Sequence, residues 1–363
     1  MLKRMANWFD DRTGYRRLLD IYRSRTVAGG PRWRYVTGSC LLWMLVVVGL
    51  TGLLLMTTYS PSSTNAWASV HFIEHTAGGS FIRGLHYWGG QGLLILLALH
   101  TLRVLLAGVY RAPRELIWAT GLLLLPITLF WAITGNPLAW TQSGYGQIQV
   151  ETNIIASTPL VGPVIQRILI GGEELGHLTL THLYVLHVAV FPLLAFALLG
   201  LHVLQVFRHG TAVSSNSEAD DTNLPYWPHQ SLRNIAAFAV SLAIVSVLAL
   251  VQGAPLDAPA DPTLPSAPRP EWYFMFLFEL RRYFSGDWEI VATLLIPLGV
   301  LIVLLAMPAI DRRLPRRLGL AFRVLVVGGG LAGWGTLTYL AVDRDRHDPE
   351  FQAAQATARQ LAA

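Results

Sequence analysis

The chain has 363 residues, of which 53% are hydrophobic and only 13% are charged. A soluble domain averages about 25% charged residues, so this composition excludes an ordinary soluble protein and predicts an integral membrane protein. The formal net charge of +5 reflects membrane topology, as argued below, and nothing in the chain indicates nucleic acid binding. The single cysteine, Cys40, excludes an intrachain disulfide.

Seven stretches of the chain are long and apolar enough to cross a lipid bilayer as helices. They are residues 35–57, 85–107, 116–134, 183–206, 233–251, 289–307 and 320–341. Residues 1–32 precede them and mix charges with Trp8, Phe9, Leu18, Leu19 and Ile21, which predicts an amphipathic helix lying at the membrane surface. The expected fold class is an all-α integral membrane protein.

The segments between the spans predict how the chain is divided. Residues 211–230 are polar and indicate a linker between a four-span part (33–210) and a three-span part (231–342), which is followed by a tail (343–363). Residues 136–180 form a long amphipathic connection, which predicts short helices along the outer surface. Residues 252–270 are too rich in proline for a helix and predict an extended outer loop.

The basic residues predict which ends of the spans face the cytoplasm. Arginines gather on one side of the predicted membrane, whereas the opposite loops (58–84, 135–182 and 252–288) mix acids and bases more evenly. The positive-inside rule therefore puts the N-terminus in the cytoplasm and, after seven spans, the C-terminus outside. The arginines on the cytoplasmic side are Arg103, Arg111, Arg114, Arg208, Arg233, Arg312, Arg313, Arg316, Arg317 and Arg323.

Two of the predicted spans each carry two histidines. His86 and His100 are fourteen residues apart, and His187 and His202 are fifteen apart. On a helix each pair falls on nearly one face, with about 21–22 Å between its members along the axis. A lone histidine on an apolar helix is more often a core residue than a ligand, but four at matched spacings inside a membrane indicate function. Two such helices side by side would form two bis-histidine sites, which suit a metal or haem iron.

Two pairs of glycines repeat the same spacing. Gly38 and Gly52 in the first span are fourteen residues apart, as are Gly121 and Gly135 in the third. One glycine in a membrane helix usually marks close helix packing. Two pairs in register with the histidines indicate that a flat, bulky cofactor passes close to the backbone at each level.

Several longer motifs carry a family resemblance. They are AWASVHFI (66–73), FIRGLH and LLALHTLRV (within 81–104), RAPRELIWATG (111–121), TLTHLYVLH (179–187), and PADP with PEWY (within 259–273). With them the sequence resembles, over nearly its whole length, the cytochrome b family of the bc1 and b6f complexes. The histidine spacings and the seven spans resemble the b6f type, with the cytochrome b6 and subunit IV parts joined in one polypeptide.

The resemblance implies two non-covalent b haems. His86 and His187 would bind the iron of a low-potential haem near the outside, and His100 and His202 that of a high-potential haem near the cytoplasm. Arg83 is expected to meet a haem propionate.

On the inner side, Arg103 and Arg114 either meet propionates too or only anchor their helices. The family also implies that Gly38, Gly52, Gly121 and Gly135 contact the haems. A covalent third haem is not expected, because the cysteine that attaches it in the chloroplast-type protein aligns with Val36 and not with Cys40.

The resemblance also implies a quinol-oxidising site on the outer side. It would be built from residues 140–160, with Tyr145 lining it, and from Pro270, Glu271, Trp272 and Tyr273. Glu271 is the expected proton acceptor, because a carboxylate in an apolar pocket has a pKa suited to that task.

The implied activity is that of a quinol:cytochrome c (or plastocyanin-type acceptor) oxidoreductase. One electron would pass to an external acceptor and the other through both haems to an inner quinone, with proton translocation (the Q cycle). The expected partners are a Rieske iron–sulfur protein, a c-type cytochrome, quinone, membrane lipid and a second copy of the complex. The expected location is a bacterial cytoplasmic membrane.

The sequence departs from its relatives at several positions. His182 stands where an arginine is usual, residues 135–140 read GNPLAW, Glu151 stands at a usually apolar position, and Asn234 replaces an aspartate of mitochondrial relatives. Two alternatives stay open: a dihaem quinone oxidoreductase with a partner other than a Rieske protein, and a haem-free channel, transporter or structural subunit. A transporter is expected to contain internal repeats, and no repeat is apparent in the sequence.

Overall fold

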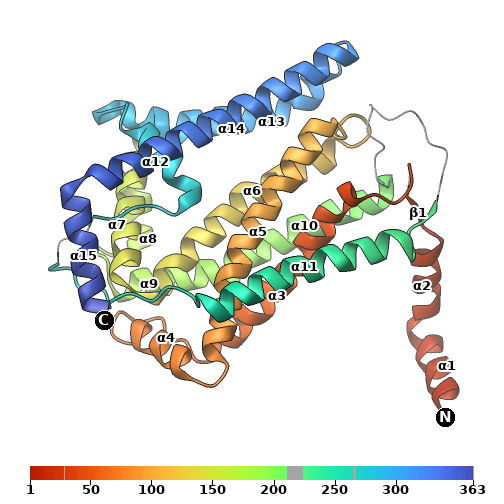
Figure 1. Ribbon diagram of the computed structural model, residues 1–363, viewed down its shortest axis with the longest axis horizontal. Helices are drawn as coiled ribbons and strands as arrows, with labels where there is room; N and C mark the ends of the chain where they lie inside the picture. Colours follow the sequence, from red (N-terminus) through yellow and green to blue (C-terminus); the bar gives the residue numbers. More distant parts are fainter. Residues whose placement is uncertain (28, 211–223, 265–266, 363) are drawn as a thin grey trace.

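The computed structural model describes residues 1–27, 29–210, 224–264 and 267–362, and it is an all-α membrane protein (Figure 1). Within these residues seven helical segments are long and apolar enough to span a membrane, which confirms the seven predicted spans. Most run further than their apolar stretches because the helix continues into polar residues at its ends. The spans are Trp33–Met56, Gly79–Ala107, Glu115–Ala139, His177–His209, His229–Val251, Val291–Asp311 and Arg316–His347.

The first four spans form the central bundle. They consist of α3 (Val36–Met56), α5 (Gly79–Ala107), α6 (Glu115–Gly135) and the pair α9 (His177–Val185) with α10 (Phe191–His209). Helix α3 packs along α5, and α10 packs along α6 (Figure 1). The two histidine-bearing spans, α5 and α9–α10, therefore belong to two neighbouring helix pairs.

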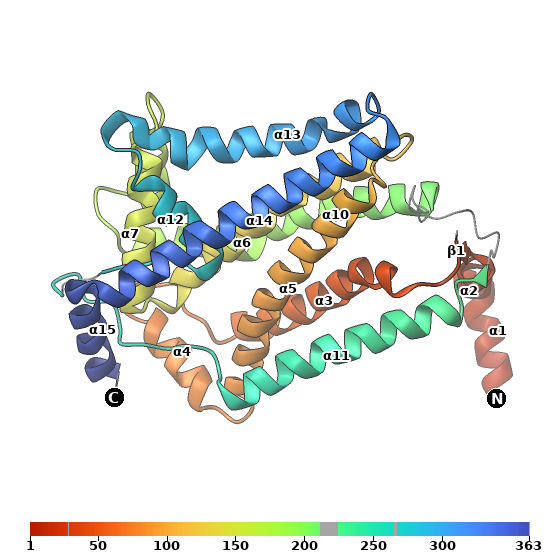
Figure 2. The ribbon, with the colours of Figure 1, turned by 45° about the horizontal axis from the view of Figure 1, so that its top comes forward.

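The remaining three spans surround this bundle. Helix α11 (His229–Val251) packs on α3 and α5, whereas α13 (Ile296–Asp311) packs on α6 and α14 (Arg316–His347) on α5. Figures 1 and 2 show α11 on the opposite side of the bundle from α13 and α14. Gly84 lets α11 approach closely, because a Cβ there would stand 2.9 Å from the Cβ of Ala249.

Two of the spans contain a turn of π-helix. Residues Leu186–Val190 join α9 to α10, and residues Val291–Leu295 lead into α13. Each π turn ends two residues before a proline, Pro192 or Pro297, whose missing N–H and bulky ring disturb the preceding turn of an α-helix. The first of these turns contains His187.

Shorter elements cover both ends of the bundle. They are α1 (Leu2–Thr13), α2 (Tyr15–Ser24), α4 (Ala66–His75), α7 (Gln142–Ala156), α8 (Gly162–Ile170), α12 (Met275–Arg281), α15 (Pro349–Ala362), and the strands β1 (Thr26–Val27) and β2 (Leu224–Pro225). Helices α7 and α8 are the short helices predicted within 136–180. Most of the predicted linker, residues 211–223, lies outside the described residues. Strand β2, which follows within the predicted linker, pairs antiparallel with β1.

The two termini lie at opposite ends of the bundle (Figure 1). We call them the α1 end and the α15 end. Helices α4, α7, α8 and α12 gather at the α15 end, so the three loops predicted to face outside share one end. At the α1 end, α1 and α2 run steeply across the direction of the long helices, and Trp8, Phe9 and Ile21 are exposed on them. This geometry suits helices that lie along a membrane surface.

A buried ion cluster ties the helix connections together at the α1 end. Asp311 and Arg323 are both fully buried, and their side chains are 2.8 Å apart. Asp311 also accepts hydrogen bonds from Tyr110 (3.1 Å) and Arg111 (2.9 Å), which follow α5. The α13–α14 connection is thus joined to the α5–α6 connection by charge-assisted hydrogen bonds.

Candidate functional site

The structure brings the four histidines together in two pairs. At the α15 end the ring centroids of His86 on α5 and His187 on the π turn are 6.2 Å apart, with the rings at 75°. At the α1 end His100 and His202 are close enough to influence each other electrostatically. These are the partners that the family resemblance implies, and each pair combines one histidine from each of the two helix pairs.

At the α15 end, a hydrogen bond at Nδ1 orients each histidine. Nδ1 of His86 donates to the backbone oxygen of Val48 (3.0 Å), and Nδ1 of His187 donates to that of Trp131 (2.9 Å). Because a carbonyl oxygen only accepts, these bonds fix the tautomer and leave each Nε2 with a free lone pair. A metal-binding histidine usually donates its other ring N–H to a carbonyl oxygen in this way.

The α1-end histidines have hydroxyl partners. Nδ1 of His100 lies 3.0 Å from Oγ1 of Thr37, and Nδ1 of His202 lies 3.2 Å from Oγ1 of Thr120. Thr51 and Thr134 stand in the same relation to His86 and His187 at the other end, at 3.3 and 3.5 Å. Each histidine therefore faces a threonine on the neighbouring helix, α3 or α6.

Each predicted glycine lies directly against one of these rings. A Cβ at Gly135 would stand 2.4 Å from Cε1 of His187, and one at Gly121 would stand 2.8 Å from Cε1 of His202. At Gly52 and Gly38 the corresponding distances to the rings of His86 and His100 are 3.0 and 3.4 Å. The atoms that a Cβ would meet are those of the histidine, so the glycines make room for the imidazole rings. The sequence predicted that a flat cofactor passes close to the backbone at these glycines. In the structure the imidazole rings lie against them.

The α15-end pair fits a haem iron. A centroid separation of 6.2 Å lets the two facing nitrogens reach one atom between them at roughly 2 Å, the usual metal–nitrogen distance for histidine.

The arginines at the two ends differ in how their side chains are bonded. At the α1 end the Nε atoms of Arg34, Arg103 and Arg114 are buried without a hydrogen-bond partner among the described residues. These donors suit anionic groups such as haem propionates. At the α15 end Arg83 is already engaged, since its guanidinium binds Glu74 and the backbone oxygens of Ala254 and Pro255.

One cavity connects the α15-end histidines with the expected quinol site. Its volume is about 790 Å³. His86 and His187 line it together with Gly52 and Gly135, and Glu271 and Tyr273 line its other part. The cavity walls are mainly apolar side chains of α3, α5 and α6. Residues more than 180 positions apart in the sequence therefore line one cavity.

Glu271 lies in a largely apolar part of this cavity. Burial raises the pKa of its carboxyl group, and a hydrogen bond from Gln147 on α7 partly opposes that rise. Burial also raises the pKa of Tyr273, whose hydroxyl bonds to Asn136. A carboxyl group with a raised pKa beside an apolar cavity is suited to accept a proton near neutral pH.

Three other predicted residues lie beside the cavity and not on its wall. The indole N–H of Trp272 donates to Oε1 of Gln91 (2.8 Å). Tyr145 stacks edge-on against Trp140, with centroids 5.5 Å apart. Pro270 begins the turn that carries Glu271. These residues support the site's shape.

The sequence argument missed several residues of the cavity wall. Tyr59, Tyr87, Gln91, Gln147 and Tyr184 all line it. Tyr59 stacks on Tyr184, with centroids 5.4 Å apart, and donates to the backbone oxygen of Leu138 (2.8 Å). Tyr87 and Gln91 are one turn apart beside His86, so their position on α5 was the only available signal.

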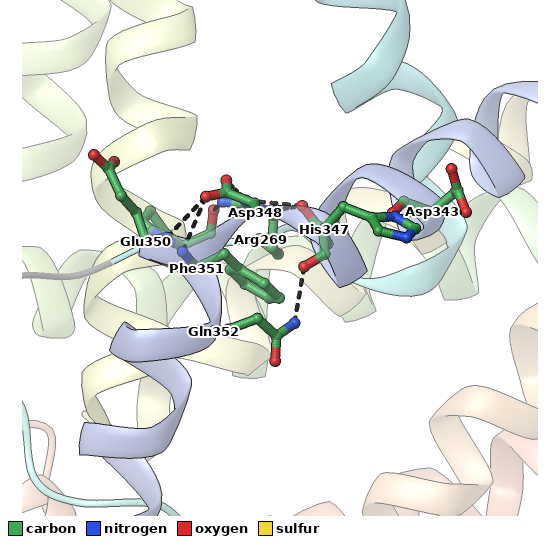
Figure 3. A network of polar contacts seen from close by, with 9 residues as sticks. Arg269, Asp343, His347, Asp348, Glu350, Phe351 and Gln352 are labelled. Atoms are coloured by element: carbon green, nitrogen blue, oxygen red, sulfur yellow. Dashed lines mark hydrogen bonds and ion pairs between the residues drawn. The ribbon is translucent and has the colours of Figure 1, made fainter.

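A polar network holds the loop that leads to Glu271. Figure 3 shows Arg269 lying against Asp348 and Phe351. The Arg269 side chain binds Asp345 at the end of α14 (2.8 Å) and Asp348 (3.6 Å), and its guanidinium lies 4.2 Å from the centroid of the Phe351 ring on α15. Its backbone oxygen accepts from Nε2 of Gln147 (3.2 Å). The C-terminal helices thus reach, through Arg269, the residue that hydrogen-bonds Glu271.

Three residues at which the sequence departs from its relatives have clear packing partners. Nδ1 of His182 lies 3.2 Å from the backbone oxygen of Leu169 and so joins α9 to α8. Cys40 is buried in α3. Asn234 on α11 is buried, and its side chain bonds to Gln230 (2.9 Å) and to the hydroxyl of Tyr226 (2.6 Å). That amide network lies at the α1 end, where an inner quinone was expected.

Comparison with known proteins places the chain in a family. Residues 91–259 match the family described as cytochrome b (N-terminal)/b6/petB. The chain is similar to cytochrome b6 from Rippkaea orientalis (34% identity over 175 residues, 48% of this chain and 79% of the relative). It is also similar to cytochrome b6 from Mastigocladus laminosus (33% over 210 residues, 57% of this chain and 98% of the relative).

The fold of the whole chain has a solved counterpart. A chain of a hyperthermophilic respiratory Complex III superposes with a TM-score of 0.75 at 23% identity, covering 93% of this chain and 98% of that one. At this identity the likeness concerns the fold alone. It covers more of this chain than the similarity to the two cytochrome b6 relatives, which extends over 48% and 57% of it.

The fold and the paired histidines define a multi-pass membrane protein of the electron-transport class, built to hold haem between helices. The chain belongs to the cytochrome b/b6 family of bc-type complexes, and its similarity to cytochrome b6 covers about half of it. Membership of this family makes b haem its cofactor class.

Proposed function

We propose that this chain is the quinol-oxidising subunit of its complex, with the reaction site in the α15-end cavity. The observation that carries the proposal is the single cavity of about 790 Å³ that joins the His86–His187 pair to Glu271 and Tyr273. A quinol bound beside Glu271 would be close to its proton acceptor and also to the His86–His187 pair, which would hold the haem that takes one of its electrons. Proximity of this kind converts two separate encounters into one bound arrangement.

The four histidines are the proposed axial ligands of two b haems. His86 and His187 would hold one at the α15 end, and His100 and His202 would hold the other at the α1 end. When bound, these haems accept and release single electrons, which lets charge cross the membrane. The unpartnered Nε atoms of Arg103 and Arg114 support propionate binding at the α1 end.

The protein's own groups would handle the proton of the quinol. Glu271 accepts the proton when a quinol O–H bond breaks, since burial holds its pKa above the usual value. Gln147 orients the Glu271 carboxylate through its hydrogen bond. The mainly apolar walls beside Glu271 favour transfer of the proton to this carboxylate.

We propose the finer features of the cycle from the membership of the cytochrome b family. One electron passes to an external acceptor, an iron–sulfur protein of the Rieske type working with a c-type cytochrome. The second crosses to a quinone near the α1 end, so that proton release outside and uptake inside make a Q cycle. The complex works as a homodimer in a bacterial cytoplasmic membrane.

The test is a reduced-minus-oxidised absorption spectrum of the purified complex, titrated against potential, with haem counted per chain. We expect two non-covalent b haems with separate midpoints. His187→Ala and His202→Ala should each remove one of them, while His177→Ala, at an exposed position of the same span, should remove neither. A complex without haem, or one whose haem content is the same in all three variants, would contradict the ligand assignment.

The quinol site is tested separately. Glu271→Gln should keep both haems and slow their reduction by added quinol by roughly a hundredfold, the lower end of what a positioned general base contributes. Unchanged reduction in this variant would show that the proton leaves by another group.

A further inference from the structure

A second carboxyl group lies next to the proposed quinol site. Glu151 is on α7, four residues after Gln147, and residues four apart lie on the same face of a helix. Gln147 lines the cavity and hydrogen-bonds Glu271. The same face of α7 therefore presents first the partner of Glu271 and then, one turn further along, another carboxyl group.

Among the residues that the structure describes, no cation pairs with Glu151. Its Oε2 atom is buried and has no hydrogen-bond partner among the described residues. Helix α8, which packs on α7, carries one charged residue, Arg167, and that side chain binds Glu173 instead (3.4 Å). The pKa of Glu151 is therefore raised by burial and by the charge of Glu271. Tyr273 is influenced by both carboxyl groups, so the three form one cluster.

Resting on the quinol-oxidising function proposed above, we propose that Glu151 is the second proton acceptor of the outer site and takes the quinol proton over from Glu271. A quinol O–H bond breaks as an O–H bond to a Glu271 oxygen forms. The Glu271 O–H bond then breaks as one forms to Glu151, which regenerates the Glu271 carboxylate. Glu151 finally releases the proton to water at the α15 end. No electron moves in these proton transfers. The electrons leave the quinol for the iron–sulfur acceptor and the haem.

The direction of transfer agrees with the two environments. Burial and the negative charge of Glu271 raise the pKa of Glu151 to about 8, whereas the Gln147 hydrogen bond opposes the rise at Glu271. A proton on Glu271 therefore moves to an ionised Glu151 because Glu151 holds it more firmly. As the pH rises through about 8, Glu151 is more often ionised and free to accept the next proton.

The experiment measures quinol-driven electron transfer by the intact complex as a function of pH, in wild type, Glu151→Gln and Glu151→Asp. In wild type the rate should rise between about pH 6 and pH 9 with a midpoint near that of Glu151. Glu151→Gln should match wild type at about pH 6 and be roughly tenfold slower at about pH 9, because an amide cannot accept a proton. Glu151→Asp should restore the rise with a shifted midpoint.

Glu174→Gln is the matched control, since Glu174 is an exposed carboxyl in the loop after α8. It should keep the wild-type profile, and the haem spectrum of each variant reports that the complex is assembled. A wild-type pH profile in Glu151→Gln would overturn the inference while leaving quinol oxidation intact. A flat profile in Glu151→Asp would overturn it as well. If the wild-type complex oxidises no quinol at any pH, the proposed function itself fails.

Discussion

At the scale of single residues, the histidine sites depend on the absence of side chains opposite them. Each imidazole ring stands where a Cβ of the facing glycine would be, most tightly at Gly135, where the Cβ would be 2.4 Å from Cε1 of His187. Backbone and ring cannot both stay in place if a methyl group is added. The histidine must then rotate or the helices α6 and α9–α10 must separate.

Gly135→Ala tests this steric argument. We expect the variant to lose or weaken the α15-end haem and to keep the α1-end haem, because overpacking at one site costs about 1–3 kcal/mol and acts locally. The measurement is haem content per chain together with the two midpoints. Gly200→Ala on α10, where nothing lies within 4 Å of the added Cβ, is the control and should retain both haems. Equal haem content in the two variants would show that the ring has room to move.

The site residues predicted from the sequence are those that recur at a regular spacing. His86, His100, His187 and His202 were found because membrane helices seldom carry histidine and because one spacing repeats. Gln147 and Tyr59 left no such trace, since their place on the cavity wall depends on how α7 and the loop after α3 pack. Such positions follow only from contacts between distant segments.

At the scale of elements, the C-terminal helices do more than end the chain. Arg269, next to the Pro270–Tyr273 turn, binds Asp345 and Asp348 and lies over Phe351 on α15 (Figure 3). In residues 267–271, the described part of the loop just before Trp272, there is no regular secondary structure. The position of this part is therefore set by side-chain contacts, of which Arg269 supplies a large share.

Arg269→Ala should loosen the Glu271 turn without removing haem. We expect the rate of quinol oxidation to fall roughly ten- to a hundredfold, since small misplacements of a catalytic group have effects of that order. The readouts are the steady-state rate and the haem spectrum. Arg346→Ala, an exposed arginine near the end of α14, removes a similar side chain and should leave the rate unchanged. A normal rate in Arg269→Ala would assign the position of the turn to other contacts.

The elements themselves were largely predictable, because a membrane span is recognised from length and hydropathy alone. The arrangement of the last three spans was not. Helix α11 follows a linker and could pack with α13 and α14 or against the bundle, and the structure has it on α3 and α5. Gly84, which lies against Ala249, and Gly92, which lies against Val245, favour this contact, but their role is visible only once both helices are side by side. The π turns before Pro192 and Pro297 were likewise not expected.

At the scale of the whole molecule, charge is divided between the two ends. The α1 end holds the buried Arg323–Asp311 pair and the unpartnered Nε atoms of Arg103 and Arg114. The α15 end holds Glu151 and Glu271 in apolar surroundings. The positive charge of Arg103 and Arg114 near the His100–His202 pair stabilises an added electron there.

This division of charge also predicts how the chain lies in the membrane. The arginine-rich α1 end should face the cytoplasm, and the α15 end, with both candidate proton acceptors, should face outside. Fusions of green fluorescent protein and of alkaline phosphatase test it, because the first fluoresces only inside and the second is active only outside. Fused after residue 363, phosphatase should be active and fluorescence absent, whereas fusions within 211–223 should give the reverse. Fluorescence from the fusion after residue 363 would show that the chain has the opposite orientation in the membrane. Quinol protons from Glu271 would then be released into the cytoplasm, which is incompatible with charging the membrane by this route.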